Sequence, residues 1–301
     1  MLFKTKPRLT IVILTYNSSQ IIEDCLNNLN SEKYKVVIVD NASKDATVDI
    51  IKEKFPKLSL TALTKNVGYG NGNNVALENV NTEFALILNP DARIAEEDIE
   101  IVLDAMDKNR LAATAGPLVL DHYPLNQKEL DAKLANMNED LNGIRDTYYE
   151  KIDGNFYVRF IIGAALFLRI SVMRQIGFFD KKIFLFYEDD ELCGRVMAKG
   201  YQNIIVPAAH AFHIGGESCG SGLKVTYIKS WHMIWSKLYW KKLRKGTLRA
   251  KRSAFKFVLV YFVKTLVCSV IFKKEKAVKN YGSLCGSFCS LIGLGSFKKT
   301  K

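Results

Sequence analysis

The sequence lacks several features that would point to other classes of protein. Its six cysteines include no CxxC pair and no zinc-type spacing, which fits a reducing compartment where thiols stay free. The first apolar run, residues 9–14, lies close to the N-terminus, is too short for a signal-peptide core and precedes no small-residue cleavage site. With a hydrophobic content of 48%, the 301-residue chain is predicted to form a sizeable core in the cytosol.

Acidic residues are nearly missing from the end of the chain. From Trp231 onward there are 17 lysines and arginines and one acid, Glu275, so this part carries +16 while the whole chain carries +12. The residues before Trp231 are therefore slightly acidic as a group. We predict a body of residues 1–225 followed by a basic amphipathic helical extension of residues 226–301.

The extension contains no uninterrupted apolar run of spanning length. Its most apolar stretch, residues 254–272, is broken by Lys256 and Lys264, and each central lysine costs a spanning helix about 2.5–3.5 kcal/mol. Basic residues on both sides favour a helix that lies in a membrane interface. No recognition motif for nucleic acid accompanies the charge. The expected partner is an anionic membrane surface, reached peripherally from the cytoplasmic face, and the alternative is a helical extension that covers the core.

The chain before the extension alternates predicted strands and helices. Apolar runs predict strands at 9–14, 36–40, 58–64 and 84–89, and helical periodicity predicts helices after Ser18 or Ser19, after Ser43 or Asp45, at 71–79 and at 96–108. This alternation predicts an α/β fold with a mostly parallel sheet and right-handed crossovers. Ligands then bind beyond the carboxyl ends of the strands.

Residues 121–157 interrupt this alternation. They are polar, with a predicted helix near 127–142, and fit either a solvated connector or an acceptor-side insertion. The block 161–206 then resumes with a strand, a short helix, a carboxylate cluster at a helix start and another strand. No internal repeat is visible.

Polar residues stand where the predicted strands end. They are Thr15-Tyr16-Asn17, Asp40-Asn41 and Asn89-Pro90-Asp91. An ionised Asp40 can accept a hydrogen bond from N3–H of uracil or thymine, which cytosine lacks, or it can cap the following helix. The tripeptide Asn89-Pro90-Asp91 fits a metal ligand set or a plain turn.

An ordered set of motifs extends over about residues 9–220, and its segments are TYNSS (15–19), VVIVDNASKDAT (36–47), KNVGYGNGNN (65–74), LNPDA (88–92), GAALFLR (163–169), GFFD (177–180), FYEDDELCGR (186–195), GY (200–201), VP (206–207) and HIGGES (213–218). This ordered set resembles glycosyltransferase family 2, in particular its bacterial rhamnosyltransferase-like branch. The resemblance implies a GT-A fold, a Rossmann-like sheet flanked by helices. Its nucleotide-sugar half is expected at about 1–120 and its acceptor half at about 121–225.

The resemblance also implies a donor site. Asp40 would contact the base, and the remaining donor-binding candidates are Thr15, Tyr16, Asn17, Asn66, Asn74 and Asn89. The run GYGNGNN is similar to a dinucleotide-binding fingerprint, but it does not follow the first strand, and the first turn, TYNSSQ, has no glycine. We therefore expect a flexible loop that closes on the nucleotide.

Metal binding is implied at two positions. Asp91 stands where GT-A enzymes keep an acidic metal motif, with Asn89 in place of its first acid, and His213 stands where the family has a histidine that completes the site. His210 is the weaker match, because the Gly-Gly and Ser218 follow His213. The expected ion is Mg²⁺ or Mn²⁺, bridging protein and diphosphate oxygens.

Four consecutive acids, residues 188–191, repel one another unless a helix N-terminus or a cation offsets their charge. They fit a solvated helix start, but the flanking aromatic residues 184, 186 and 187 favour a walled site. The resemblance implies that Asp189 is the general base, a role worth about 10²–10⁴ in rate. The acceptor-side candidates are Glu188, Asp190, Glu191, where the family usually has Asp, and Arg195, which fits a partner of either the acids or the diphosphate.

The predicted reaction is an inverting transfer of rhamnose or another hexose from a dTDP- or UDP-sugar to a glycan or lipid-linked acceptor, in cell-surface polysaccharide synthesis. A homo-oligomer is compatible with the sequence. One alternative is a nucleotidyltransferase, but TYNSSQ supplies no Gly-rich basic phosphate loop. The other is a non-catalytic sugar-nucleotide-binding scaffold, against which the presence of both Asp91 and Asp189 argues.

Overall fold

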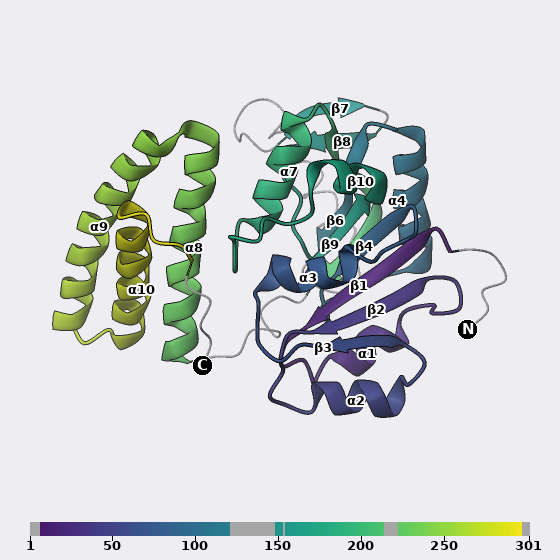
Figure 1. Cartoon of the computed structure of the whole chain (residues 1–301), viewed down its shortest axis with the longest axis horizontal. Coiled ribbons are helices and arrows are strands. Elements are labelled where there is room, and N and C mark those ends of the chain that lie inside the picture. The colour runs from purple at the N-terminus through teal and green to yellow at the C-terminus, as the bar shows by residue number, and fades with distance from the viewer. Residues whose placement is uncertain (1–6, 121–147, 153, 214–221, 297–301) are drawn as a thin grey trace. The chain divides into compact units, whose positions relative to one another are not determined.

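The computed structural model describes residues 7–120, 148–152, 154–213 and 222–296 (Figure 1). The chain divides into two compact units. The first comprises Met1–Asn66, Gly72–Phe178 and Leu192–Ser218, and the second comprises Val67–Asn71, Phe179–Glu191 and Cys219–Lys301. The predicted helix at 127–142 and the Gly-Gly and Ser218 that follow His213 lie outside the described residues.

A mixed ten-stranded sheet forms the centre of the first unit, with strand order β3-β2-β1-β4-β9-β6-β10-β8-β7 and β5 paired to β10. Strands β1, β2, β3, β4, β6, β7 and β10 point in one direction, and β5, β8 and β9 run against them. The strand bounds are β1 Leu9–Thr15, β2 Lys35–Asp40, β3 Ser59–Ala62, β4 Phe84–Leu88, β5 Ala92–Ile94, β6 Ala112–Leu120, β7 Tyr148–Ile152, β8 Asn155–Val158, β9 Ala165–Arg169 and β10 Gln202–His213.

Helices flank this sheet, as predicted for an α/β fold (Figure 1). Every residue of the central strands β1 and β4 is buried, which explains why their sequences are unbroken apolar runs rather than alternating ones. The helix bounds are α1 Ile22–Asn27, α2 Thr47–Lys54, α3 Tyr69–Leu77, α4 Glu96–Lys108, α6 Ile170–Ile176 and α7 Glu188–Ala198. Helices α3 and α7 begin with residues of the second unit.

The predicted serine caps of the first helix are wrong. Helix α1 has Ile21 at its N-cap and no side-chain cap. The Ser18 hydroxyl instead accepts a hydrogen bond from the backbone N–H of Tyr16 (3.3 Å), while the backbone N–H of Ser19 donates to Asp45 (3.0 Å). Asp45 also accepts from the backbone N–H of Thr47 (3.1 Å), the first residue of α2. The serines therefore hold the turn between β1 and α1 rather than the helix start.

The expected flexible loop at GYGNGNN is also corrected, because α3 begins at Tyr69 and includes most of this run. The glycine at 72 reflects packing rather than flexibility. A Cβ atom there would lie 2.5 Å from Cδ1 of Leu14, closer than carbon atoms approach. Asn74 accordingly lies within a helix and is 4% exposed.

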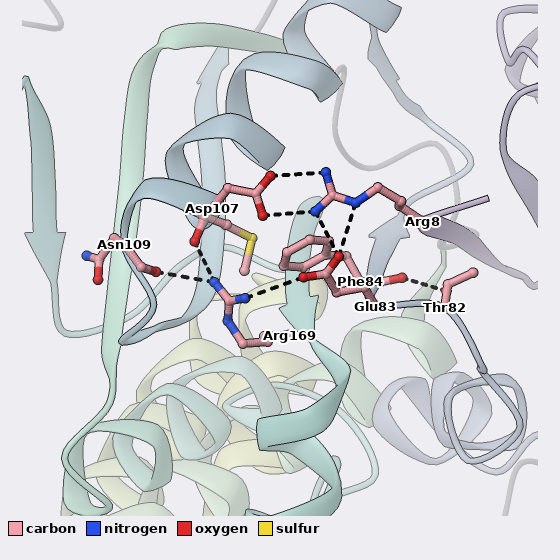
Figure 2. A network of polar contacts seen from close by, with 8 residues as sticks. Arg8, Thr82, Glu83, Phe84, Asp107, Asn109 and Arg169 are labelled. Atoms are coloured by element: carbon pink, nitrogen blue, oxygen red, sulfur yellow. Dashed lines mark hydrogen bonds and ion pairs between the residues drawn. The ribbon is translucent and has the colours of Figure 1, made fainter. Parts of the chain in front are cut away.

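A network of two arginines ties the amino end of β4 to its neighbours (Figure 2). Arg8 donates to the carboxylates of Glu83 and Asp107 at 2.8–3.1 Å. The buried Arg169, at the end of β9, donates to backbone carbonyls of Ala112 (3.0 Å), Met106 (2.5 Å) and Asn109 (3.2 Å). Because these carbonyls lie at the start of β6 and before it, Arg169 stabilises the link between α4 and the sheet.

Three long helices follow in the second unit: α8 Leu223–Lys245, α9 Thr247–Val270 and α10 Lys274–Leu291. They confirm the predicted basic helical region at the C-terminal end. A small core of Ile234, Leu238 and Ala254 joins α8 to α9. Helix α10 lies so close to α8 that a Cβ on Gly286 would be 2.5 Å from the carbonyl oxygen of Trp231, so only glycine permits this packing.

Helix α9 has its apolar face in the open. Its buried positions are Ala250 and Ala254, whereas Phe255, Leu259, Phe262 and Leu266 are each 51–54% exposed. Among the described residues this is the one helix long and apolar enough to cross a membrane, judged on length and composition alone. Its sequence keeps the two lysines, 256 and 264, that favoured an interfacial position.

Candidate active site

The carboxyl edge of the parallel strands gathers most of the predicted donor and metal residues of the first unit. Thr15 ends β1, Asp40 ends β2, His213 ends β10, and Asn89 directly follows β4. Because these four strands run in the same direction, their last residues meet at one edge of the sheet. The prediction that polar residues stand at strand ends is confirmed.

Asp40 is the centre of a buried polar cluster and is 1% exposed. Its Oδ1 accepts hydrogen bonds from the hydroxyls of Thr15 (2.9 Å) and Ser43 (2.5 Å), and its Oδ2 accepts from the backbone N–H of Ser43 (2.9 Å). A carboxylate has about four lone-pair positions. Oδ2 therefore retains acceptor capacity, while the other contacts fix the carboxylate plane.

Ser43 is a further candidate for the donor site, which the sequence pattern places only at a helix start. Its hydroxyl also accepts from the backbone N–H of Asn17 (2.8 Å), so it connects the turn after β1 to the turn after β2. The available signal was its position three residues after a strand-ending aspartate, where a hydroxyl can return to the carboxylate.

Asn17 has a left-handed backbone with φ 53°. This conformation is several-fold enriched in asparagine relative to other non-glycine residues. Its Oδ1 accepts from the backbone N–H of Lys44 (2.7 Å). Tyr16, one residue earlier, is partly exposed. The turn after β1 is therefore rigid, with an aromatic side chain at its surface.

Two of the asparagines predicted to bind the donor lie in the loop between β3 and α3 and in α3 itself. The Asn66 side chain accepts a hydrogen bond from Nδ2 of Asn41 (3.1 Å), and the Asn41 backbone N–H donates to the Thr15 carbonyl (2.8 Å). Asn66 is thus linked to the residue after Asp40. Asn74 lies in α3 and is buried.

Asp91 and His213 form the candidate metal centre. Nε2 of His213 lies 3.1 Å from Oδ1 of Asp91 and 3.5 Å from Nδ2 of Asn89. The Asp91 side chain is 1% exposed and that of His213 is 24% exposed. In an octahedral site, two neighbouring ligand atoms that each lie about 2.1 Å from the ion are about 3 Å from one another. The separation of Asp91 Oδ1 and His213 Nε2 therefore fits a divalent ion. The described residues contain no cluster of three or more His, Cys, Asp or Glu that could hold one.

His210, the alternative histidine, belongs to a different contact. Its backbone N–H donates to Oδ1 of Asp98 on α4 (2.9 Å), and its Nδ1 is 3.8 Å from the same oxygen. It does not share the oxygen that His213 contacts.

The four acids open helix α7 in the second unit. Phe186 and Tyr187, just before them, both have φ 65°, a strained backbone for aromatic residues. Burial, reinforced by the charge of Asp189, raises the pKa of Glu188 to about 8. Burial and Asp189 likewise raise the pKa of Asp190 to about 6, although Arg244 opposes the shift. Glu191 is also buried, so the cluster is not a solvated helix start.

The Arg195 side chain forms hydrogen bonds with the backbone. Its guanidinium donates to the carbonyl oxygens of Ile176 (2.8 Å), Gly177 (2.7 Å) and Phe178 (2.7 Å), at the end of α6. These bonds join α7 to α6 within the first unit. The prediction that Arg195 serves the acceptor side stays a prediction.

Comparison with known families decides the class of enzyme. A family model described as glycosyl transferase family 2 matches residues 10–177, more than half of the chain. The chain belongs to glycosyltransferase family 2. It is therefore a glycosyltransferase rather than a nucleotidyltransferase.

Curated relatives and solved structures agree with this family. The N-acetylglucosaminyl-diphospho-decaprenol L-rhamnosyltransferase of Mycobacterium tuberculosis (strain ATCC 25618 / H37Rv) is 25% identical, over 70% of this chain and 78% of the relative. Rhamnosyltransferase WbbL of Escherichia coli (strain K12) is 26% identical, over 67% and 82%. The mannosyltransferase PcManGT from Pyrobaculum calidifontis, solved with GDP-Man and Mn²⁺, matches with a TM-score of 0.57 at 15% identity, over 96% of this chain and 88% of that one. The last match confirms the predicted GT-A fold.

Proposed function

We propose that this glycosyltransferase moves rhamnose or another hexose from a dTDP- or UDP-sugar to a hydroxyl of a lipid-linked or glycan acceptor, with inversion and with a divalent ion. The observation that carries the proposal is the 3.1 Å contact of Asp91 and His213 at the strand edge where Asp40 also lies. We place the product in cell-surface polysaccharide synthesis. Two relatives are named rhamnosyltransferases, and the name of one gives a diphospho-decaprenol-linked sugar, which supports a lipid-linked acceptor.

Asp40 recognises the nucleotide base of the sugar donor. Its Oδ2 keeps an unused acceptor position, and Thr15 and Ser43 hold the carboxylate in one orientation. Uracil and thymine present an N3–H donor there, whereas cytosine presents an acceptor. Tyr16, Asn17, Asn66, Asn74 and Asn89 complete the donor side.

Asp91 and His213 would hold Mg²⁺ or Mn²⁺ together with oxygens of the donor diphosphate. A bound ion supplies neutralisation of the charge that grows on the leaving diphosphate. The fold keeps the Asp91 side chain buried and in contact with His213 without a bound donor.

Asp189 is the proposed general base. Its carboxylate takes the proton from the acceptor hydroxyl while the hydroxyl oxygen attacks the anomeric carbon and the nucleotide diphosphate leaves from the opposite face. This single displacement inverts the anomeric centre. Glu188, whose pKa is raised to about 8, keeps its proton near neutral pH, which lowers the number of like charges beside Asp189, whereas Asp190, with a pKa of about 6, is then mostly ionised. Glu188, Asp190, Glu191 and Arg195 form the acceptor side.

The C-terminal helices would bring the enzyme to the cytoplasmic face of the membrane. The exposed apolar face of α9 and the lysines and arginines on α8, α9 and α10 support this proposal. A lipid-linked acceptor, whose phosphate and first sugar lie at that surface, would then be held at the same surface as the enzyme. The substrate would not have to leave the bilayer.

A transfer assay tests the proposal. The purified protein, with Mn²⁺ and a panel of nucleotide sugars, should release a nucleoside diphosphate from a dTDP- or UDP-sugar when a prenyl diphosphate-linked sugar is added. Asp189→Asn should keep donor affinity in calorimetry and lose about 10²-fold or more in turnover. Donor binding without transfer in the unaltered protein would support a non-catalytic scaffold instead.

A further inference from the structure

A pocket lies within the second unit. It encloses about 480 Å³, in the range of small-molecule sites, between α8, the segment after α10 and the loop before α7. Its lining includes Lys181, Lys182, Trp235, Tyr239, Lys242 and Leu294. We propose that this pocket binds the phosphate group of the lipid-linked acceptor. The proposal rests on the function proposed above.

The charge of the pocket fits an anion. Three lysines line it, and for Lys182 and Lys242 the described residues provide no ion-pair partner. The acid beside them, Asp180, accepts a hydrogen bond from the hydroxyl of Tyr239 (2.7 Å). Lysine ammonium groups bind phosphate as point charges and donate charge-assisted hydrogen bonds. A phosphate or diphosphate would therefore be stabilised by several positive charges at once.

The walls of the pocket are fixed by side-chain contacts. Trp235 is 5% exposed and stacks on Tyr239 with ring centroids 5.2 Å apart and planes 10° apart. Its indole N–H donates to the carbonyl of Leu294 (2.9 Å), and the hydroxyl of Ser296 donates to the carbonyl of Lys182 (2.7 Å). The segment after α10 is thereby attached both to α8 and to the loop that carries the lysines.

The carboxyl end of α10 does not need the lysines, because carbonyl groups in its last turn already accept backbone hydrogen bonds. The last turn of that helix is closed by the backbone N–H of Leu294, which donates to the carbonyl of Cys289 (2.9 Å), and by that of Gly293, which donates to Ser290 (3.3 Å). These bonds satisfy carbonyls that otherwise attract cations at helix ends. A bound anion therefore explains the three lysines of the pocket better than an interaction with the end of α10 does.

The surroundings of the pocket favour a lipid phosphate over a free one. Leu294, which lines it, is 55% exposed, and the nearby Ile292 and Phe288 are 54% and 50% exposed. A phosphate held by the lysines would leave its hydrocarbon chain against these apolar side chains. Apolar burial contributes about 0.8 kcal/mol for each CH₂ group, which an inorganic anion cannot gain.

The pocket is connected to the proposed base through the loop before α7. The same loop carries the pocket lysines and ends at the acids of α7. Helix α8 holds this loop, since the hydroxyl of Ser236 donates to the carbonyl of Leu185 (2.9 Å) and His232 stacks on Phe184 at 4.7 Å. In a diphosphate-linked sugar, the charged group is attached to the ring whose hydroxyl reacts. A pocket on this loop can thus position that ring for Asp189.

Tryptophan fluorescence tests the assignment, because Trp235 forms one wall of the pocket. Titration of the full chain with farnesyl diphosphate should give a saturable change that Trp235→Phe removes. The double variant Lys181→Ala/Lys182→Ala should bind about 10-fold more weakly or worse, whereas Lys251→Ala, an exposed lysine on α9 outside the pocket, should bind like the unaltered chain. An equal loss in the Lys251 variant would overturn a pocket-specific site.

Three further ligands separate the sources of the phosphate. Farnesol should not bind, and inorganic diphosphate should bind more weakly than farnesyl diphosphate. Vesicles of phosphatidylcholine with phosphatidylglycerol should not displace farnesyl diphosphate; if they do so at equal phosphate concentration, the pocket is a headgroup site and the acceptor assignment fails. Calorimetry with UDP or dTDP must be unchanged in the double variant, so that loss at this pocket is distinct from failure of the donor site.

Discussion

The imidazole Nε2 of His213 lies 3.1 Å from Oδ1 of Asp91, although 122 residues separate them in the sequence. The antiparallel pairing of β5 with β10 produces this contact, because it sets His213 opposite Ala92, the residue after Asp91. A short strand thus places a carboxylate and an imidazole on one point at the end of the sheet. Each residue alone is weak evidence for a metal site. Their contact in the structure leads to the specific prediction that both bind the same ion.

Asp91→Asn and His213→Ala should each weaken Mn²⁺ binding by about 10-fold or more, since each removes one of two protein ligands. The measurement is the free Mn²⁺ signal in electron paramagnetic resonance, in the presence of UDP or dTDP. His210→Ala is the matched control and should retain the affinity of the unaltered chain. Full transfer activity in excess EDTA would exclude the metal from the mechanism.

The raised pKa of Glu188 predicts a particular dependence of stability on pH. Its pKa in the folded state, about 8, lies above the ordinary glutamate pKa of 4.5 that the unfolded chain has. Between these pH values the folded state holds a proton that the unfolded state has lost, so stability falls as pH rises through this window. Glu188→Gln removes this contribution. From pH 5 to pH 8 the variant should gain on the order of 3 kcal/mol relative to the unaltered chain.

Chemical denaturation at both pH values measures this difference in unfolding free energy. Glu53→Gln, at an exposed acid on α2, should leave the pH dependence unchanged. A parallel pH dependence of the unaltered chain and the Glu188 variant would mean that Glu188 is ionised throughout.

The two arginines of the network should differ in their contribution to stability (Figure 2). Burial lowers the pKa of Arg169, and its guanidinium is the donor to three backbone carbonyls. Arg169→Leu should cost about 3 kcal/mol or more, because those carbonyls lose their donor. The Arg8 side chain is 52% exposed, and Arg8→Ala should cost about 1 kcal/mol or less. Thermal unfolding that ranks the two variants in the opposite order would contradict this reading.

The sequence was sufficient for the central strands and the polar residues at their ends. Strands β1, β2 and β4 are buried and apolar without interruption, and a polar residue such as Asp40 marks the point where burial in the sheet ends. Helix α4 was predicted with its observed bounds, Glu96–Lys108, because three acids open it and its apolar positions have helical spacing.

Other features depend on contacts that sequence patterns do not contain. The strand predicted at the end of the block 161–206 continues as β10 to His213, because a register shift between Val206 and His210 accommodates Pro207. Strand β5 has three residues, too few for a pattern, and yet its pairing aligns Asp91. The glycines of α3 predict flexibility from the sequence alone, although the glycine at 72 makes room for Leu14.

The interfacial position of α9 leads to the last prediction. Its exposed apolar row, Phe255, Leu259, Phe262 and Leu266, lies at helical spacing on one side, while Ala254 faces α8. Each lysine or arginine near an anionic surface contributes about 1 kcal/mol. The full chain should therefore sediment with vesicles that contain phosphatidylglycerol, and less so as salt increases. Vesicles of phosphatidylcholine alone should bind it weakly.

A charge substitution on the apolar row separates docking from packing. Phe262→Glu should weaken vesicle binding, because it places a carboxylate where the row would enter the interface, and it should leave thermal unfolding nearly unchanged because this side chain is half exposed. Thr61→Glu, at an exposed position of β3 in the first unit, is the matched control, because it adds the same charge outside α9. Extraction of the bound protein by high salt is expected of a helix that lies flat, since Lys256 and Lys264 can reach the headgroups from there. Protein that resists both salt and alkaline carbonate would instead have inserted α9 across the bilayer.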